Sequence, residues 1–226
     1  MAEVHTSRNF ESELRELQGQ ALAMGEHSKR IVRIAFDAFW QGKPSLAADV
    51  PKIEAQLDQD EIDLHALALR IIALRQPVAA DLRFLAAALR LVTDLERIGD
   101  EAVNLAALAV DEPDHAKSIV SDELFAMDHQ AQEMLQVALV AFVERDPDRA
   151  ESVRQHDKVV DQHCATVIAR MTDYVASHSA DVPAGLRVMW AANDLERIAD
   201  HATNVAEEVI FMVRGQDVRH GLAERE

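Results

Sequence analysis

Apolar residues recur at helical spacing along almost the whole chain of 226 residues. Between Phe84 and Ala109 the apolar positions alternate in steps of four and three, the seam that a packed helix presents to its neighbours. The same alternation returns between Val188 and Met212. No stretch alternates apolar and polar residues with a period of two over a useful length. The pattern therefore predicts an all-α fold without β-strands.

Prolines, glycines and short polar segments divide this pattern into six long helices. The expected ranges are about 7–40, 46–75, 78–111, a fourth ending near 145, a fifth from Pro147 to about 177, and a sixth from about 183 to Gly215. Asp146 before Pro147 is a typical N-cap, with proline at the first helical position. Pro51 is awkward inside the second helix. An alternative is a separate turn at 45–48, followed by a helix that Asp49 caps.

The second half of the chain repeats the first. Residues 94–106 read DLERIGDEAVNLA, and residues 194–206 read DLERIADHATNVA, one hundred positions later. Self-similarity at a fixed period indicates two copies of one supersecondary unit. Each copy has about a hundred residues, enough to bury a core. We therefore expect two tandem, similar three-helix bundles, residues 1–112 and 113–226.

Carboxylates four residues apart occur in both copies, and such pairs share one face of a helix. In each copy the pair in the repeated phrase is preceded by another on the helix before it. Facing residues of an antiparallel hairpin lie equally far from its turn. Positions 54/100 and 58/96 are both centred on Pro77, while 157/200 and 161/196 are both centred on 178–179. This spacing predicts an N-terminal cluster (Glu54, Asp58, Glu96, Asp100) and a C-terminal cluster (Asp157, Asp161, Glu196, Asp200).

Crowded carboxylates repel one another, and a bound cation would reverse the sign of that interaction. An all-oxygen set favours Mg²⁺, Mn²⁺, Ca²⁺ or an iron species and argues against a thiolate-type zinc site. The roles of other neighbouring side chains remain open. Asn104 and Asn204 could supply or orient a ligand, His201 is either a ligand or a surface residue, and Cys164 fits an inert buried thiol. The alternative is that arginines neutralise the acidic faces, with Arg83, Arg97, Arg187 and Arg197 as candidates.

Charge and composition narrow the classes of function. The net charge of −17 disfavours electrostatic binding to nucleic acid or anionic lipid. A single cysteine excludes an internal disulfide, and neither a secretory signal nor an apolar run of membrane-spanning length is visible, so a cytoplasmic protein is expected. No nucleophile–base arrangement or Gly-rich phosphate loop occurs, and no Glu-x-x-His motif of the kind found in di-iron carboxylate bundles lies within an expected helix. These absences weigh against an enzyme.

Several motifs together resemble the PhoU family. Besides the two repeated phrases, RQPVAADLR at 75–83, DKVVDQ at 157–162 and GQDVRH at 215–220 occur in that order, so the resemblance covers nearly the whole chain. It implies two three-helix bundles, often as a homodimer. It also implies metal held by E/D-x-x-x-D motifs, which are here the eight residues of the two clusters. The candidate ions are divalent or iron-type: Mg, Mn, Fe or Zn.

The family role implied by this resemblance is that of a cytoplasmic negative regulator of phosphate uptake and phosphate-starvation signalling. Such a protein is an adaptor between the ATPase subunit of the phosphate ABC transporter and a sensor histidine kinase, peripheral to the membrane at most. Two other functions stay open. One is a metal-dependent hydrolase or oxygen-chemistry enzyme that uses the clustered carboxylates. The other is a purely structural helical scaffold.

Overall fold

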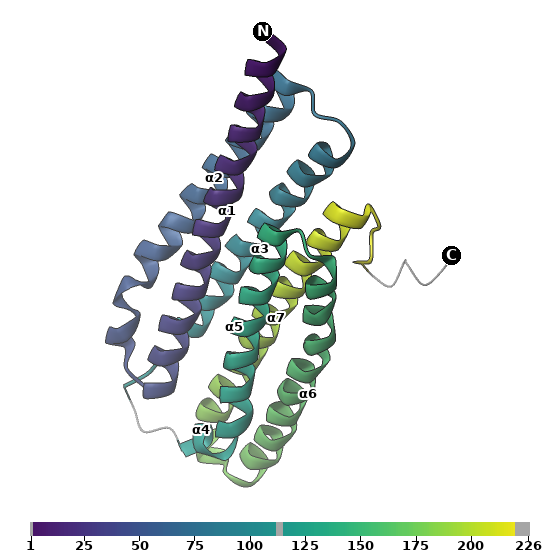
Figure 1. Cartoon of the computed structure of the whole chain (residues 1–226). Helices are drawn as coiled ribbons and strands as arrows, with labels where there is room; N and C mark the ends of the chain where they lie inside the picture. Colours follow the sequence, from purple (N-terminus) through teal and green to yellow (C-terminus); the bar gives the residue numbers. More distant parts are fainter. Residues whose placement is uncertain (1, 112–114, 220–226) are drawn as a thin grey trace.

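The structure is a computed structural model that describes residues 2–111 and 115–219, and within these ranges it contains no β-strand (Figure 1). The all-α prediction is confirmed. The described residues form six long α-helices, one short helix and two 3₁₀ turns. The elements are α1 (Ala2–Gln41), η1 (Pro44–Asp49), α2 (Val50–Arg75), α3 (Ala79–Ala107), α4 (His115–Ile119), α5 (Ser121–Glu144), α6 (Pro147–Ser177), η2 (Ser179–Asp181) and α7 (Val182–Arg214).

Helix α2 follows the alternative with a restart near Pro51. The 3₁₀ turn η1 ends at Asp49, and Pro51 lies in the first turn of α2, where a missing backbone donor has no effect on the helical hydrogen bonds. Asp49 occupies the N-cap position of α2, as this alternative predicts, but its side chain accepts no cap hydrogen bond. Its carboxylate instead lies 3.8 Å from the guanidinium of Arg30.

The ends of α6 and α7 are as predicted. The Asp146 carboxylate accepts hydrogen bonds from the backbone N–H groups of Asp148 and Arg149, both at 3.0 Å, and Pro147 follows it. These contacts pair N–H groups that would otherwise lack a partner in the first turn of α6. Gly215 terminates α7 with a left-handed φ of 70°.

The expected fourth helix is divided into α4 and α5. Val120 leaves the helical region with φ −125° and ψ 29°. Just before it, the buried ammonium of Lys117 donates to the carbonyls of Phe39 at 2.9 Å and Trp40 at 3.2 Å, which end α1. A cation at a helix C-terminus complements the helix dipole. Helix α3 also ends four residues earlier than expected, and the predicted boundary between residues 112 and 113 lies outside the described residues.

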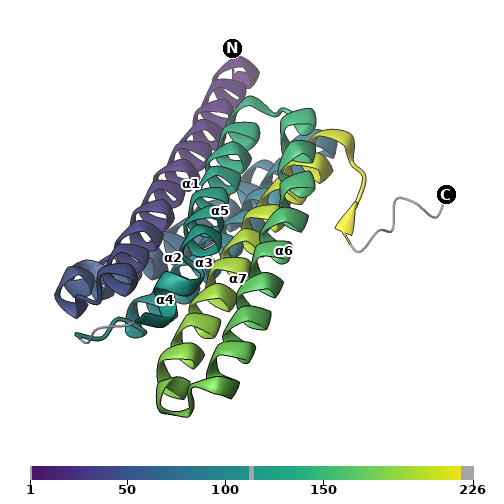
Figure 2. The same cartoon turned by 90° about the horizontal axis from the view of Figure 1, so that it is seen from below.

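Helices α3 and α7 pack against each other at the centre of the molecule. Helix α1 packs on α3, α5 packs on α7, and α1 and α5 also touch, while α2 and α6 lie at opposite edges (Figures 1 and 2). One hydrophobic cluster runs through both repeats. It includes Phe84 of α3 stacked on Phe142 of α5, with ring centroids 5.6 Å apart. The two repeats are therefore joined by a shared core.

A small residue sets the distance between α2 and α3. A Cβ added to Gly99 would lie 2.6 Å from Leu57 Cδ1, far inside ordinary contact distance. The second repeat has Ala199 at the position of Gly99, and the residue that corresponds to Leu57 is the shorter Val160. The two repeats thus use complementary pairs of side-chain volumes at the same crossing.

This pairing predicts that the effect of Gly99→Ala depends on residue 57. In the wild-type chain the extra methyl collides with Leu57, so the substitution should not stabilise the protein, although alanine favours a helix over glycine by about 1 kcal/mol. In a Leu57→Val background the methyl fits, and the same substitution should stabilise by about 1 kcal/mol. Urea unfolding of the four proteins measures the coupling. Independent, additive effects of the two substitutions would contradict it.

Candidate metal sites

The C-terminal cluster forms on the α6–α7 hairpin. Carboxylate oxygens of Asp157, Asp161 and Asp200 all lie within 4.8 Å of one another. Asp157 is half-buried between the helices, while Asp161 and Asp200 are exposed to solvent. Asp157 also accepts a 3.1 Å hydrogen bond from Thr203 Oγ1 on α7. The antiparallel register therefore brings three of the four expected side chains to one point.

The carboxylates of the C-terminal cluster repel one another, and three of them have raised pKa values. Burial raises the pKa of Asp200, and the charges of Asp157 and Asp161 raise it further. The fourth member, Glu196, also has a raised pKa, caused by burial and then by the neighbouring charges of Asp200 and Asp161. Burial likewise raises the pKa of Asp157, against the opposing hydrogen bond from Thr203. Four negative groups thus lie close together with too little positive charge beside them.

The N-terminal cluster on the α2–α3 hairpin is partly neutralised. Burial raises the pKa of Glu96, followed by the charge of Asp100, and Asp58 contributes from α2. Arg97, however, lies 3.5 Å from the Glu96 carboxylate and 3.2 Å from that of Asp100. Within the described residues, only the C-terminal cluster brings three ligand atoms within 4.8 Å. Glu54 is half-buried one turn before Asp58.

The arginine at the same position of the second repeat has another partner. Arg197 lies 3.1 Å from Glu101 of α3, a carboxylate that is only 4% exposed. This ion pair crosses from one repeat to the other. Since Arg97 lies between two carboxylates of its own cluster and Arg197 pairs with the opposite repeat, the arginine alternative holds for the N-terminal cluster more than for the C-terminal one.

Two aspartates that the spacing of carboxylate pairs missed lie where α3 and α7 cross. Asp94 accepts hydrogen bonds from His201 Nδ1 at 2.9 Å and from Asn204 at 3.1 Å. Its counterpart Asp194 faces Glu101 instead, and burial together with that charge raises the pKa of Asp194 to about 7. Both aspartates begin the repeated phrase, so the repeat itself carried the signal that could have found them.

The structure also gives the contacts of the side chains whose roles the sequence did not decide. His201 and Asn204 point to Asp94, and Asn104 donates a 3.3 Å hydrogen bond to Glu101. Cys164 is buried one turn after Asp161, and burial, followed by Glu196 and Asp161, raises the pKa of its thiol to about 11. A neutral thiol at physiological pH fits the inert role expected for it.

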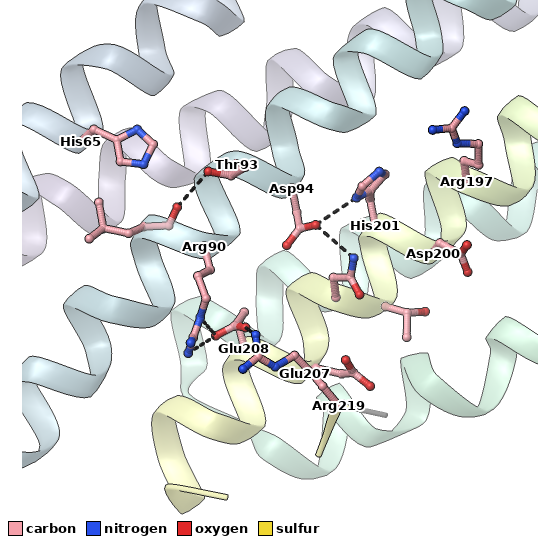
Figure 3. Close-up of a pocket in the computed structure, with 13 residues that line it drawn as sticks. His65, Arg90, Thr93, Asp94, Arg197, Asp200, His201, Glu207, Glu208 and Arg219 are labelled. Atoms are coloured by element: carbon pink, nitrogen blue, oxygen red, sulfur yellow. Dashed lines mark hydrogen bonds and ion pairs between the residues drawn. The ribbon is translucent and has the colours of Figure 1, made fainter. Parts of the chain in front are cut away.

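An open pocket of about 930 Å³ lies beside the C-terminal cluster, between α2, α3, α7 and the segment after α7 (Figure 3). Several of its charged side chains form ion pairs, Arg90 with Glu208 and His201 with Asp94 among them. Glu208, which is 3% exposed, accepts from Arg90 at 2.7 Å and lies 3.5 Å from Arg219. Asp200 belongs to the C-terminal cluster and also lines this pocket. The pocket therefore gives the cluster an open approach lined by polar side chains.

Fold and site together define a class: a helical protein of two fused repeats, with carboxylates gathered on the outer hairpin of each. The family model described as PhoU domain matches the chain twice, at residues 21–109 and 124–209. The chain therefore belongs to the PhoU family. Both matches fall inside the two repeats read from the sequence.

Individual relatives align with this chain over nearly its full length. A Pseudomonas aeruginosa protein named phosphate-specific transport system accessory protein PhoU homolog is 39% identical, over 96% of this chain and 90% of that protein. The Escherichia coli protein of the corresponding name is 31% identical over the same two shares. The crystal structure of PhoU from Pseudomonas aeruginosa superposes with a TM-score of 0.87 at 37% identity, covering 92% of this chain and all of that one. PhoU from Streptococcus pneumoniae shares the fold, with a TM-score of 0.84 at 24% identity over 92% of this chain and 99% of that one.

The difference between the two clusters predicts that the same substitution, aspartate to asparagine, changes stability differently in each. In chelator-treated protein, Asp200→Asn removes a repelling charge and should stabilise the fold by about 0.5 kcal/mol. Asp100→Asn, its repeat equivalent, removes a partner of Arg97 and should give no stabilisation. Thermal unfolding of the two variants at neutral pH measures this. Equal shifts would show that the two clusters are electrostatically alike.

The raised pKa of Asp194 predicts that the free energy of unfolding falls as the pH rises. Its folded pKa of about 7 lies above the value of about 4 for an unfolded aspartate, so its destabilising effect develops as pH rises from about 4 to 7 and is complete above that. Asp194→Asn should therefore stabilise on the order of 1 kcal/mol at pH 8, with no gain near pH 4.

The control for Asp194→Asn is Asp94→Asn at the equivalent position. This variant weakens the hydrogen bonds from His201 and Asn204 and should destabilise at neutral pH. Chemical unfolding at several pH values measures both. A gain for Asp194→Asn that does not change with pH would contradict the assigned cause.

Proposed function

We propose that this chain is an accessory and regulatory protein of phosphate transport that binds a metal ion at the C-terminal cluster. The role in phosphate transport is supported by family membership and by the names of the full-length relatives. Metal binding is supported by one observation above all: three carboxylates from two helices have oxygens within 4.8 Å of one another. In a small volume of this kind, a cation is the simplest compensating group.

The donor set suits a hard or borderline cation. Asp157, Asp161 and Asp200 would hold the ion, with Glu196 on the neighbouring turn of α7 as a further oxygen donor. Carboxylate oxygens suit Mg²⁺, Mn²⁺, Ca²⁺, iron or a carboxylate-bound Zn²⁺. When bound, the ion supplies positive charge that links α6 to α7. The role of these residues is to bind and to fix the hairpin, with Thr203 orienting Asp157.

The N-terminal cluster is the second proposed metal site, and the weaker one. Glu54, Asp58, Glu96 and Asp100 offer the same oxygen chemistry, but Arg97 already contacts two of them. A cation there would have to displace or repel the guanidinium. We therefore expect metal to occupy the C-terminal cluster at lower concentration than the N-terminal cluster.

The proposed partners are the ATPase subunit of the phosphate importer and a sensor histidine kinase, with this chain as a negative regulator that connects them. No described helix is long and apolar enough to cross a membrane. Contact with both partners would then occur through surfaces of the helical bundle. A regulatory role of this kind requires no catalytic group, and the family resemblance favours it over a carboxylate-based enzyme.

Metal binding is tested by thermal unfolding with and without divalent ions and Fe²⁺. A ligand that binds only the folded state stabilises it by about 2.7 kcal/mol at a hundred times its dissociation constant. We expect this rise in the wild type and its loss in Asp161→Asn/Asp200→Asn. The equivalent N-terminal double variant, Asp58→Asn/Asp100→Asn, should keep the response at low metal concentration. A wild type that responds to no ion would contradict the metal-binding part.

The regulatory role is tested with purified ATPase subunit and sensor kinase as separate baits. Retention of the wild type by either bait, changed by phosphate or metal, supports the adaptor. If neither retains it under any condition, the adaptor role is wrong, whatever the metal result. A screen for metal-dependent turnover, with Asp200→Asn as control, covers the alternative: turnover abolished by that change would identify an enzyme instead.

A further inference from the structure

A groove of about 460 Å³ lies between the antiparallel helices α1 and α2 (Figure 1), and we call it the α1–α2 groove. It shares no residue with either carboxylate cluster or with the pocket beside α7. Its floor is apolar, since Leu64 and Leu67 are only 2% and 6% exposed and two alanines lie beside them. Its polar lining consists of Glu16, Gln20, Asp60, Asp63 and Arg70.

The negative charge of the α1–α2 groove is only partly compensated. Its lining has three carboxylates and one guanidinium, that of Arg70. Asp60 lies 2.9 Å from His27 Nδ1. Asp63 and Glu16 accept hydrogen bonds from glutamine amides of their own helices, at 2.9 Å and 3.3 Å. Among the described side chains, neither of these two carboxylates has a cation within ion-pair distance. The groove therefore combines an apolar floor with unpaired negative charge.

The second repeat offers a direct comparison, because α5 and α6 correspond to α1 and α2 residue by residue. Asp161 lies 103 positions after Asp58, and Arg145 lies 103 positions after Gly42. Gly42 and Arg145 have left-handed φ angles of 63° and 54°, each just beyond the end of its helix, α1 or α5. One offset thus aligns both helices of the pair.

At the corresponding place in the second repeat, a cation of the protein crosses the groove. Arg170 of α6 reaches Glu123 of α5, with 2.6 Å between guanidinium and carboxylate. The equivalent residues of the first repeat are Leu67 and Gln20, so this ion pair is missing there. The first repeat carries Glu16 and Asp63 instead, where the second repeat has Ile119 and Thr166. The α1–α2 groove therefore has carboxylates for a cation that the chain itself does not supply.

The positions of these carboxylates define the shape of the missing cation. Glu16 lies four residues before Gln20, and Asp63 lies four residues before Leu67. Since the two helices are antiparallel, the carboxylates lie on opposite sides of the Gln20–Leu67 level, about 12 Å apart along the groove at 1.5 Å per residue. An occupant needs positive charge near each end and a hydrocarbon chain between them, over the two leucines. Within the described residues, the groove brings no three ligand atoms within 4.8 Å, which favours an organic cation over a metal ion.

We propose that the α1–α2 groove binds an aliphatic polyamine of about the length of spermidine. Its terminal ammonium groups lie at Glu16 and Asp63, and its carbon chain covers Leu64 and Leu67. The net charge of −17 concentrates organic cations around the whole chain, and the groove adds the specific contacts. This inference goes beyond the proposed function and does not depend on metal binding, because no residue of the groove belongs to a cluster.

Binding is tested by calorimetric titration of spermidine into the full-length chain at physiological ionic strength, which screens non-specific attraction. The wild type should bind one spermidine per chain. Glu16→Gln/Asp63→Asn should raise the dissociation constant at least about tenfold. The control Asp122→Asn/Asp173→Asn removes the same charge from exposed positions of α5 and α6 and should leave binding unchanged. All four positions are exposed, so thermal unfolding should stay near that of the wild type.

A second variant fills the groove without changing the net charge. Gln20→Glu/Leu67→Arg builds the ion pair of Glu123 and Arg170 into the first repeat, so that a guanidinium occupies the place of the ligand. Spermidine binding should weaken at least about tenfold, in protein whose helix content and unfolding transition show that it is folded. If this variant does not fold, the comparison of Glu16→Gln/Asp63→Asn with its control decides.

Four results overturn the proposal. The first is the absence of saturable binding to the wild type. The second is equal weakening in Asp122→Asn/Asp173→Asn, which would identify general counterion attraction. The third is the loss of binding in Asp161→Asn/Asp200→Asn, which would place the ammonium groups at the C-terminal cluster. The fourth is saturable binding of an arginine-containing peptide but not of spermidine, which would assign the groove to a protein side chain.

Discussion

The packing of α3 against α7 is the contact on which the rest of the structure depends. Each of these helices carries one copy of the repeated phrase, and each uses one face for the other repeat and another face for its own edge helix. The face toward the other repeat presents Asp94 to His201 and Glu101 to Arg197. The face toward the edge helix presents the carboxylates of the two clusters. A single helical period thus places the inter-repeat ion pairs and the candidate ligands on different sides of the same helix.

Small differences between the repeats make the two clusters unequal. Glu101 in the first repeat corresponds to His201 in the second, and Arg197 pairs with Glu101 across the repeats. The equivalent contact of Arg97 with His201 would offer the guanidinium cation an imidazole in place of a carboxylate. Arg97 instead stays with the carboxylates of its own cluster. This difference at the crossing of α3 and α7 gives Arg197, but not Arg97, a carboxylate partner in the other repeat, and Arg97 partly neutralises its own cluster.

Much of the fold could be predicted from the sequence, because its signals were local or repeated. The cap of α6 by Asp146, the end of α7 at Gly215 and the facing of Asp157 with Asp200 each follow from short-range patterns and from distance to a turn. The break at Val120 could not be predicted, since no proline or glycine marks it. It follows Lys117, whose side chain contacts the end of α1, 77–78 residues earlier in the chain.

The ion-pair and hydrogen-bond partners of the site residues could not be predicted from local sequence patterns. The spacing of carboxylates predicts their position along a hairpin. It does not predict which arginine side chain pairs with them. Arg97 and Arg197 occupy identical places in their repeats and still have different partners, because the choice depends on residues of the other repeat. For the same reason Asp94 and Asp194, one hundred positions apart, have different environments.

The hydrophobic cluster that runs through both repeats has a consequence for cooperativity. If the halves were separated, the apolar faces that α3 and α7 turn to each other would be open to water, so neither half is expected to persist by itself. Melting should then be one all-or-none event for the entire chain. A cation held at one edge would, through that event, also protect the helices at the far edge from unfolding.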